Sequence, residues 1–363
     1  MKSELTLIEL ARELQRQADV KHDYLVKETA MEAATVLDDG GVQTVMLDIQ
    51  GQGEHGITPH AHKQIATHLN IPGRYYERMR QQDPGLLCVN INRWLEKNTE
   101  STRLVRTLDH TVRGFLSNAY KPLDNFDFAQ AALSTIHEIG GITVQASAIT
   151  DTRMHIKAVS DRIQGEVRKG DIVQWGVALS NSEVGAGQLR IDPLIYRLVC
   201  TNGAVARQNV GAYSRRHVGR RLLSDLDAAR VLSDEARQAD DKAFWLAVRD
   251  VIRGVFNPDT FQQLLEVWQG AASRPIEAAI PSVVEVTLKR HKLPESFNTG
   301  ILDALVRDGD MSQYGLGNAF TRYSQEMETF DAANDLEEIG ADIMSMSGSE
   351  WGKLQELAVA LAA

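Results

Sequence analysis

The chain has 363 residues and a formal net charge of −10, with 43% hydrophobic and 24% charged residues. This composition is typical of a soluble globular protein with two or three domains. It contains no apolar run near the ~20 residues of a membrane span and no apolar signal-peptide core at its start. The two cysteines, Cys88 and Cys200, exclude a disulfide framework and a cysteine-based zinc cluster, so we expect a cytoplasmic protein without membrane contact.

Charge is distributed unevenly along the chain. Residues 193–224, called the basic segment below, contain no acidic residue and six arginines. Residues 300–363 contain twelve acidic and three basic residues, a balance of −9, which leaves the preceding part close to neutral. A basic cluster in an acidic protein usually has an anionic partner, and nucleic acid is the commonest large one. Net charge is therefore no objection to nucleic-acid binding.

The first hundred residues show mainly helical periodicity. Thr58 followed by Pro59 is a favourable helix start, with the threonine as N-cap and the proline at the first position. A strand is expected at residues 42–49. Helices are expected at 5–19, at 58–69, from Pro72 onward, and at 84–98. We predict a helical N-terminal part over residues 1–100.

The middle of the chain is rich in short alternating strands. Asp109 and His110 are expected to form the turn of a hairpin, and polar residues 161–170 a long hairpin loop. Strands are expected at 102–108, 111–117, 142–149, 153–160, 172–179, 188–191 and 196–201, with a helix at 126–139. Such strands favour an antiparallel sheet, so residues 101–223 are predicted to form an antiparallel β-rich core that contains the basic segment.

Residues 224–363 are expected to be helical and acidic. Helices are expected at 224–256, 258–270, 275–291, 297–308, 312–346 with a break near Gly340, and 350–362. The predicted fold class is α+β, with an antiparallel sheet core flanked by helices and a mostly helical C-terminal part.

Three stretches carry a family resemblance. They are Arg113–Asn125, with the pattern R-x-x-x-S-x-x-Y-x-x-x-D-N, Leu179–Gly187, and Arg197–Gly203 continued by Arg216–Gly219. In this order they resemble domain of unknown function 932, a family encoded by phages, plasmids and integrated mobile elements. The resemblance implies a role in a mobile element but supplies no catalytic residues. The expected architecture, a sheet flanked by helices, is also similar to that of Rad52-type annealases. This similarity concerns the fold alone.

Four histidines, at positions 55, 60, 62 and 68, are candidates for metal binding. His60 and His62 are two residues apart, so they lie on different faces of the expected helix. The H-E-x-x-H spacing of a zinc site is absent, and an ordinary polar helix is the better interpretation. We predict neither a metal nor another cofactor.

Catalytic patterns are weak. Asp109 and His110, with Glu183 and Asp192, contain the groups of an acid–base set, but their spacing does not bring them together. Ser180 and Ser182 lack the G-x-S-x-G elbow of a nucleophilic serine. Cys200 lies in an apolar run and is expected to be a buried small side chain. Gly185 and Gly187 are expected to permit a tight bend, fixed by local hydrogen bonds of Asn181 and Glu183. No catalytic residue is predicted.

The basic segment provides the candidate binding residues. Arginine binds phosphate through two parallel hydrogen bonds, and an aromatic ring can stack on a base, although a core position is the other interpretation of Tyr213. The candidates are Arg207, Tyr213, Arg215, Arg216, His217, Arg220 and Arg221. The leading hypothesis is a single-stranded DNA-binding protein of a phage or mobile element, with a recombination or annealing role, acting as a homo-oligomer. The alternatives are a metal-dependent enzyme acting on phosphate esters and an interaction protein that antagonises a host factor.

Overall fold

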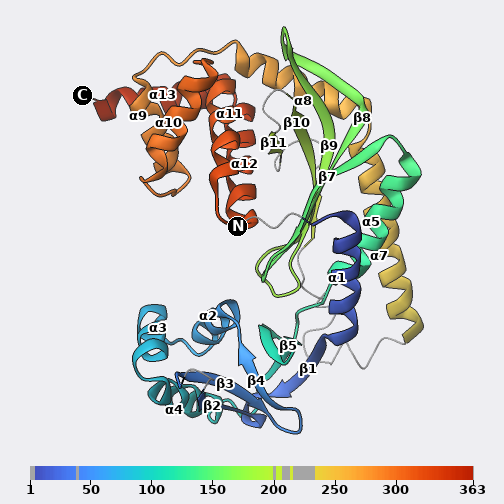
Figure 1. The fold of residues 1–363 in the computed structure, drawn as a ribbon, viewed down its shortest axis with the longest axis vertical. Helices are drawn as coiled ribbons and strands as arrows, with labels where there is room; N and C mark the ends of the chain where they lie inside the picture. The colour runs from blue at the N-terminus through green and yellow to red at the C-terminus, as the bar shows by residue number, and fades with distance from the viewer. Residues whose placement is uncertain (1–4, 38–40, 199–201, 207–212, 216–233, 363) are drawn as a thin grey trace.

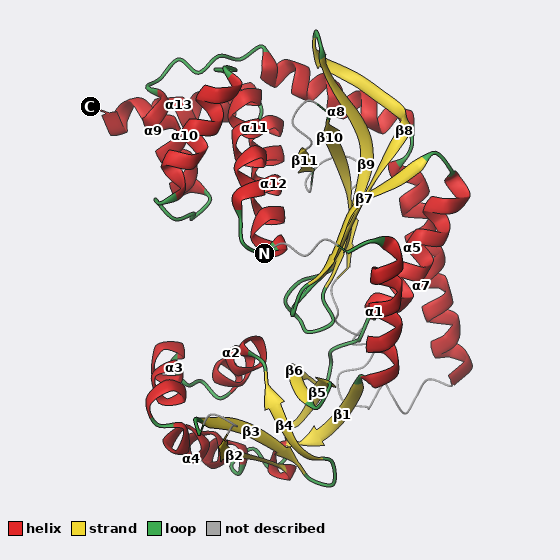
Figure 2. Cartoon of the chain, in the orientation of Figure 1, coloured by secondary structure: helices red, strands yellow, loops and turns green. Residues whose placement is uncertain are grey.

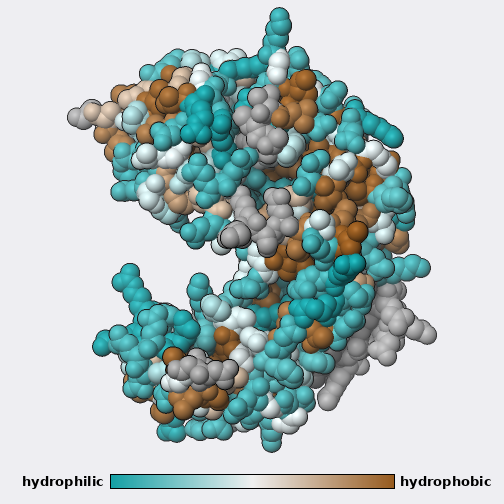
Figure 3. Space-filling model, in the orientation of Figure 1, coloured by the Kyte–Doolittle hydropathy of each residue, from teal (hydrophilic) through white to brown (hydrophobic). Residues whose placement is uncertain are grey.

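The computed structural model describes residues 5–37, 41–198, 202–206, 213–215 and 234–362. These residues form two lobes, each built around a six-stranded sheet, and the molecule curves into a C (Figure 1). The space-filling view shows a deep hollow between the lobes (Figure 3). Both sheets are largely antiparallel and most helices lie in the C-terminal part, which confirms the predicted α+β class (Figure 2).

The N-terminal lobe contains the first sheet, in the order β1-β5-β6-β4-β3-β2. The strands are β1 (His22–Lys27), β2 (Met31–Leu37), β3 (Gln43–Ile49), β4 (Gly53–Ile57), β5 (Thr102–Leu108) and β6 (Thr111–Ser117). All pairs are antiparallel except β4 with β6, where Ile57 pairs with Val112. Helices α2 (Pro59–His68), α3 (Gly73–Gln82) and α4 (Pro84–Leu95) pack on it and bury Ile65, Leu87 and Ile91.

The expected helical N-terminal part therefore also holds four strands, and the expected boundary at residue 101 lies within the first sheet. β1 gives a weak sequence signal because its side chains alternate only between exposed and half-buried positions. The starts of two helices follow the expectation. Thr58 is the N-cap of α2, where its side chain accepts a hydrogen bond from the Ala61 amide, and Asp83 caps α4 in the same way.

The C-terminal lobe contains the second sheet, in the order β11-β10-β9-β8-β7, with β12 also paired to β10. The strands are β7 (Ile142–Ile149), β8 (Met154–Arg168), β9 (Asp171–Asn181), β10 (Leu189–Arg197), β11 (Asn202–Val205) and β12 (Tyr213–Arg215). The expected loop at 161–170 is wrong, because β8 continues to Arg168 and pairs it with Asp171 across a short turn. The polar side chains there occupy exposed positions of a strand. Likewise, one continuous strand, β10, runs where separate strands were expected at 188–191 and 196–201. Residues 199–201 of the second expected strand lie outside the described residues.

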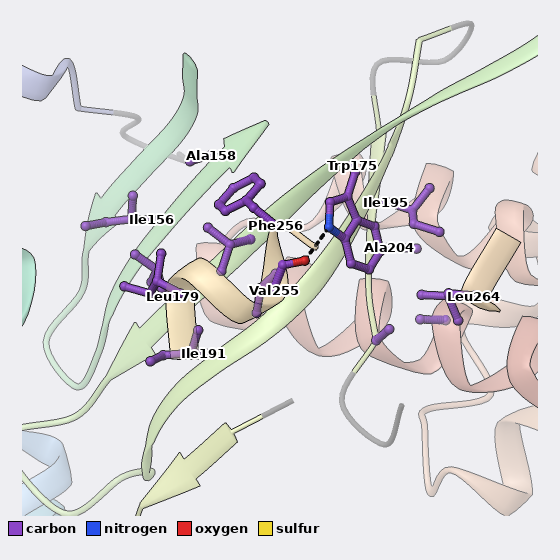
Figure 4. Close-up of a cluster of buried hydrophobic side chains, with 14 of the residues drawn as sticks. Ile156, Ala158, Trp175, Leu179, Ile191, Ile195, Ala204, Val255, Phe256 and Leu264 are labelled. Atoms are coloured by element: carbon purple, nitrogen blue, oxygen red, sulfur yellow. Dashed lines mark hydrogen bonds between the residues drawn. The ribbon is translucent and has the colours of Figure 1, made fainter. Parts of the chain in front are cut away.

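One face of the second sheet packs against helices. These are α1 (Leu7–Val20), α5 (Asn125–Ile139), α7 (Asp234–Val255) and α8 (Pro258–Ala272). Alternate strand residues such as Ile156, Val177 and Ile191 point into this core. The buried Trp175 donates a hydrogen bond from its indole nitrogen to the Val255 carbonyl at 2.6 Å, which joins the sheet to the end of α7 (Figure 4). A buried indole N–H needs such a partner, so the contact fixes the ring's position.

The opposite face is covered by α12 (Phe330–Ser345), which packs with α11 (Gln313–Tyr323). The remaining C-terminal helices, α9 (Ile280–Arg290), α10 (Phe297–Asp308) and α13 (Gly348–Ala362), share a separate core with them. The break expected near Gly340 is wrong, since the chain turns at residues 324–329 and Gly340 lies inside α12. A Cβ there would lie 2.5 Å from Thr321, so this glycine permits the close approach of α11. No helix among the described residues is long and apolar enough to cross a bilayer.

Candidate functional site

Two predicted binding residues lie on β12, a three-residue strand paired to β10. The guanidinium carbon of Arg215 lies 4.5 Å from the centre of the Phe244 ring, a cation–π contact with α7. No carboxylate among the described residues lies within ion-pair distance of Arg215. The Tyr213 ring is half-buried against the main core of the C-terminal lobe. Its predicted stacking role remains a prediction.

Five of the predicted residues, Arg207, Arg216, His217, Arg220 and Arg221, lie outside the described residues, as does Cys200. The first arginine of the basic segment, Arg197, ends β10 and is mostly buried. It forms an ion pair with Asp171 at 2.6 Å and lies 3.7 Å from Asp308 of α10. These carboxylates give Arg197 a structural role. The basic segment therefore contains one arginine, Arg197, that is paired with carboxylates and one, Arg215, that has no carboxylate partner in the described part of the chain.

The family motifs meet at the junction of the two lobes, around the fully buried Arg106 of β5. Its three guanidinium nitrogens are satisfied by Asp23 at 2.8 Å, Asp124 at 2.7 Å and the carbonyl of Glu183 at 2.9 Å. Burial alone would raise the pKa of Asp124, but the charges of Arg106 and Lys21 hold this pKa below its ordinary value. The site is thus a buried cation surrounded by fixed acceptors.

Arg113 of β6 belongs to the same group, which we call the junction network: Arg106, Arg113, Asp124, Asn125 and Glu183. The Nη2 atom of Arg113 lies 2.5 Å from Oε2 of Glu183, and both side chains are more than nine-tenths buried. The other oxygen of Glu183 accepts a hydrogen bond from the Asn125 amide at 2.7 Å, at the start of α5. The network therefore ties the sheet of the N-terminal lobe to α5 of the C-terminal lobe.

The loop after β9 supplies the network's backbone contacts. Gly185 has φ +77°, which favours glycine, as expected for a tight bend. The hydroxyl of Ser182 accepts a hydrogen bond from the Ala186 amide, which holds the loop locally. Asn181 instead donates to the Leu123 carbonyl at 2.7 Å. Asn181 and Glu183 thus anchor the loop to α5, so the expectation that they make local hydrogen bonds is wrong.

The N-terminal lobe holds this loop from the other side. Gln64 of α2 donates to the Val184 carbonyl at 2.7 Å and accepts from the Phe115 amide at 2.7 Å. The Tyr120 hydroxyl donates to the Ser182 carbonyl at 3.0 Å, and burial raises the pKa of this phenol. The partners in these bonds are 51 to 120 residues apart in the sequence, and spacing alone does not predict them. One feature of the sequence could have indicated these contacts: Arg113, Tyr120, Asp124 and Glu183 all lie in the family motifs.

The histidine candidates are dispersed. Their ring nitrogens contact the Gly53 carbonyl (His55), the Val184 carbonyl (His60), the Tyr76 hydroxyl (His62) and the Glu28 carboxylate (His68). Burial lowers the pKa of His62 to about 4, so its ring is neutral at pH 7. Within the described ranges no group of three or more histidine, cysteine or carboxylate side chains has the arrangement of a metal site.

The four candidate acid–base residues, Asp109, His110, Glu183 and Asp192, do not form a common site. Asp109 and His110 form the β5–β6 turn, with φ +49° and +56°, as expected for a tight hairpin. Asp109 pairs with Arg16 of α1, Glu183 with Arg113, and Asp192 with Arg190. Each carboxylate therefore has its own cation.

The acidic helix α12 is paired across the second sheet. Asp331 accepts a hydrogen bond from His155 at 2.6 Å, Glu337 forms a buried ion pair with Lys157, and Asp335 lies 3.6 Å from Arg153. These three basic residues lie on or just before β8, outside the basic segment. These acidic residues of α12 are therefore bonded to or lie close to basic residues of the second sheet.

Comparison with known proteins gives a family but no described function. No curated protein and no solved structure matches the chain. The family described as "Domain of unknown function (DUF932)" matches residues 112–357, which include four of the five junction-network residues and all six strands of the second sheet. The chain belongs to this family.

Proposed function

We propose that the protein binds single-stranded nucleic acid, DNA in the first instance, through the arginines of the basic segment. One observation carries the proposal: 32 residues without a carboxylate contain Arg215, which has no carboxylate partner among the described residues. Elsewhere in the fold, buried arginines are matched with acids, as Arg106 is with Asp23 and Asp124. A cluster of arginines with no acidic residue nearby in the sequence is suited to an external anion.

The chemistry of a phosphate strand fits this segment. A guanidinium donates two parallel hydrogen bonds to a phosphate, and each neutralised phosphate releases counterions. Arg207, Arg215, Arg216, Arg220 and Arg221 are the proposed phosphate contacts, with His217 and Tyr213 beside them. We further propose a cytoplasmic protein of a phage or mobile element that serves recombination or strand annealing as a homo-oligomer.

A binding assay with a matched control tests the proposal. Fluorescence anisotropy of a labelled single-stranded oligonucleotide at low salt should show saturable binding, weakened in the double variant Arg220→Ala/Arg221→Ala. The control is Arg74→Ala/Arg78→Ala, which removes the same charge from the exposed surface of α3. Double-stranded DNA and RNA of equal length measure the strand preference. Absence of binding by the folded wild type, or equal loss in both double variants, contradicts the proposal.

A further inference from the structure

A cavity of about 910 Å³ lies beside the junction network and has no role in the function proposed above. Its walls come from α1, from the start of α2, from the β5–β6 hairpin and from the β7–β8 turn. Cavities of ~300–1,000 Å³ with a few polar groups are typical sites for small ligands. Charged groups of both signs line this cavity: Arg12, Arg16 and Arg113, with Glu9, Glu13, Asp109 and Asp151.

The first wall contains a buried cation with unused bonding capacity. Arg113 lines the cavity with a side chain that is only 9% exposed. Its Nη2 atom contacts Glu183, but its Nε atom is buried and has no hydrogen-bond partner. Buried donors without partners are rare, because leaving one unpaired is unfavourable. A ligand oxygen that reached this guanidinium would satisfy it.

The start of α2 stands beside Arg113. The parallel pairing of β4 with β6 brings the Thr58 amide to the Val112 carbonyl at 2.9 Å, next to Arg113 in the chain. Thr58 and the hydroxyl-bearing Thr111 line the same cavity. The first turn of α2 contains no acidic residue, so the positive end of this ten-residue helix is not neutralised there. The Thr58 and Ala61 amides are already bonded and Pro59 has no N–H, so this helix end contributes its dipole and the threonine hydroxyls. Together with the guanidinium, these groups favour a phosphate.

The wall formed by α1 carries both signs of charge. Its acceptors are Glu9 and Glu13, with Asp151 of the β7–β8 turn, and its cations are Arg12 and Arg16. Arg16 lies between Glu13 and Asp109, with a distance of 2.9 Å to each. Carboxylates bind ligand N–H and O–H groups. A ligand that suits both walls has a phosphate at one end and hydrogen-bond donors at the other.

We propose that this cavity binds a nucleoside monophosphate, as a free nucleotide or as the phosphorylated end of a strand. The phosphate lies against Arg113, Thr111 and the start of α2, and the sugar and base face the carboxylates of α1. The site is separate from the basic segment, so it stands whether or not the arginines of that segment bind nucleic acid.

Isothermal titration calorimetry with a nucleoside 5′-monophosphate tests this site. Thr111→Val removes one hydroxyl with little change in shape, and we expect it to weaken binding about tenfold, the usual effect of losing a hydrogen bond to a charged group. Thr44→Val is the matched control, because Thr44 lies in the same sheet on β3, away from the cavity. Arg113→Lys retains the charge that balances Glu183, and it should weaken binding further because lysine lacks the planar fork.

Two competitors distinguish the ligand sources. Displacement of the nucleotide by a 5′-phosphorylated oligonucleotide, but not by its unphosphorylated form, assigns the site to strand ends. Failure of both to compete assigns it to free nucleotides. Equal affinity of the Thr111→Val, Thr44→Val and wild-type proteins, or no saturable binding of nucleotide by the folded wild type, overturns the proposal. The double variant Arg220→Ala/Arg221→Ala should still bind the nucleotide. Nucleotide binding at the cavity can then be distinguished from strand binding by the basic segment.

Discussion

The arginines of the junction network and those of the basic segment are the same residue type in opposite environments. Arg106 is fully buried, and two carboxylates and a carbonyl take up its donors. Arg215 lies on a short strand at the border of the second sheet, stacks on Phe244 and has no carboxylate partner among the described residues. A buried cation without acids would be strongly unfavourable, whereas a partly exposed one remains available to external anions. The surroundings, and not the residue type, separate structural arginines from candidate binding arginines.

Removal of the buried cation should have the largest effect. Arg106→Met leaves Asp23 and Asp124 without their shared partner, and we expect the free energy of unfolding to fall by about 3–5 kcal/mol. Urea unfolding followed by circular dichroism measures this loss. The control Arg93→Met, at a residue 72% exposed, should change stability by less than about 1 kcal/mol. Similar small losses in both variants would show that the junction network does not hold the lobes together.

Acid should weaken the junction network through Asp124. The pKa of Asp124 is below 3.8 in the folded protein, so its contribution to stability is complete above this pH and is lost as the pH falls through the lower folded value. Asp124→Asn should therefore be less stable than wild type at pH 7, and the difference should shrink between pH 4 and pH 2. Urea midpoints at several pH values check this. A difference that stays constant with pH would mean that Asp124 carries no charge-dependent stabilisation.

The smallest effect is expected at Arg215. Its described contact is the cation–π contact with Phe244, which contributes about 0.5–1 kcal/mol at an exposed site. Arg215→Ala should therefore lower the free energy of unfolding by no more than about 1 kcal/mol. Thermal unfolding beside Arg106→Met measures the contrast. A loss as large as that of Arg106→Met would place Arg215 among the structural arginines.

The sequence predicted elements that depend on local signals. Thr58 with Pro59 predicted the start of α2, and β5, β6 and β7 begin and end at the expected residues, because caps and alternation are encoded within a few positions. The segment 161–170 was misassigned because one face of β8 is solvated there and reads as a polar loop. Gly340 was read as a breaker, although its role is to admit α11 against α12, a contact that a helical pattern does not reveal.

The candidate site was less predictable. Arg113 and Glu183 meet across 70 residues of chain, and nothing in their spacing pairs them. The acidic balance of residues 300–363 cannot be tested by deleting them. Tyr314 and Met344 of this region belong to the main core of the C-terminal lobe, so deletion would disrupt folding. Point variants are therefore the suitable tests of charge in this protein.

The salt dependence of single-stranded DNA binding tests the central claim most directly. Each phosphate neutralised on a single strand contributes about 0.7 to the slope of log affinity against log salt. Arg220→Ala/Arg221→Ala should flatten the slope of the wild type by roughly 1.4, while Arg74→Ala/Arg78→Ala leaves it unchanged. An equal slope in the wild type and Arg220→Ala/Arg221→Ala would show that these side chains do not contact phosphate and would contradict the account.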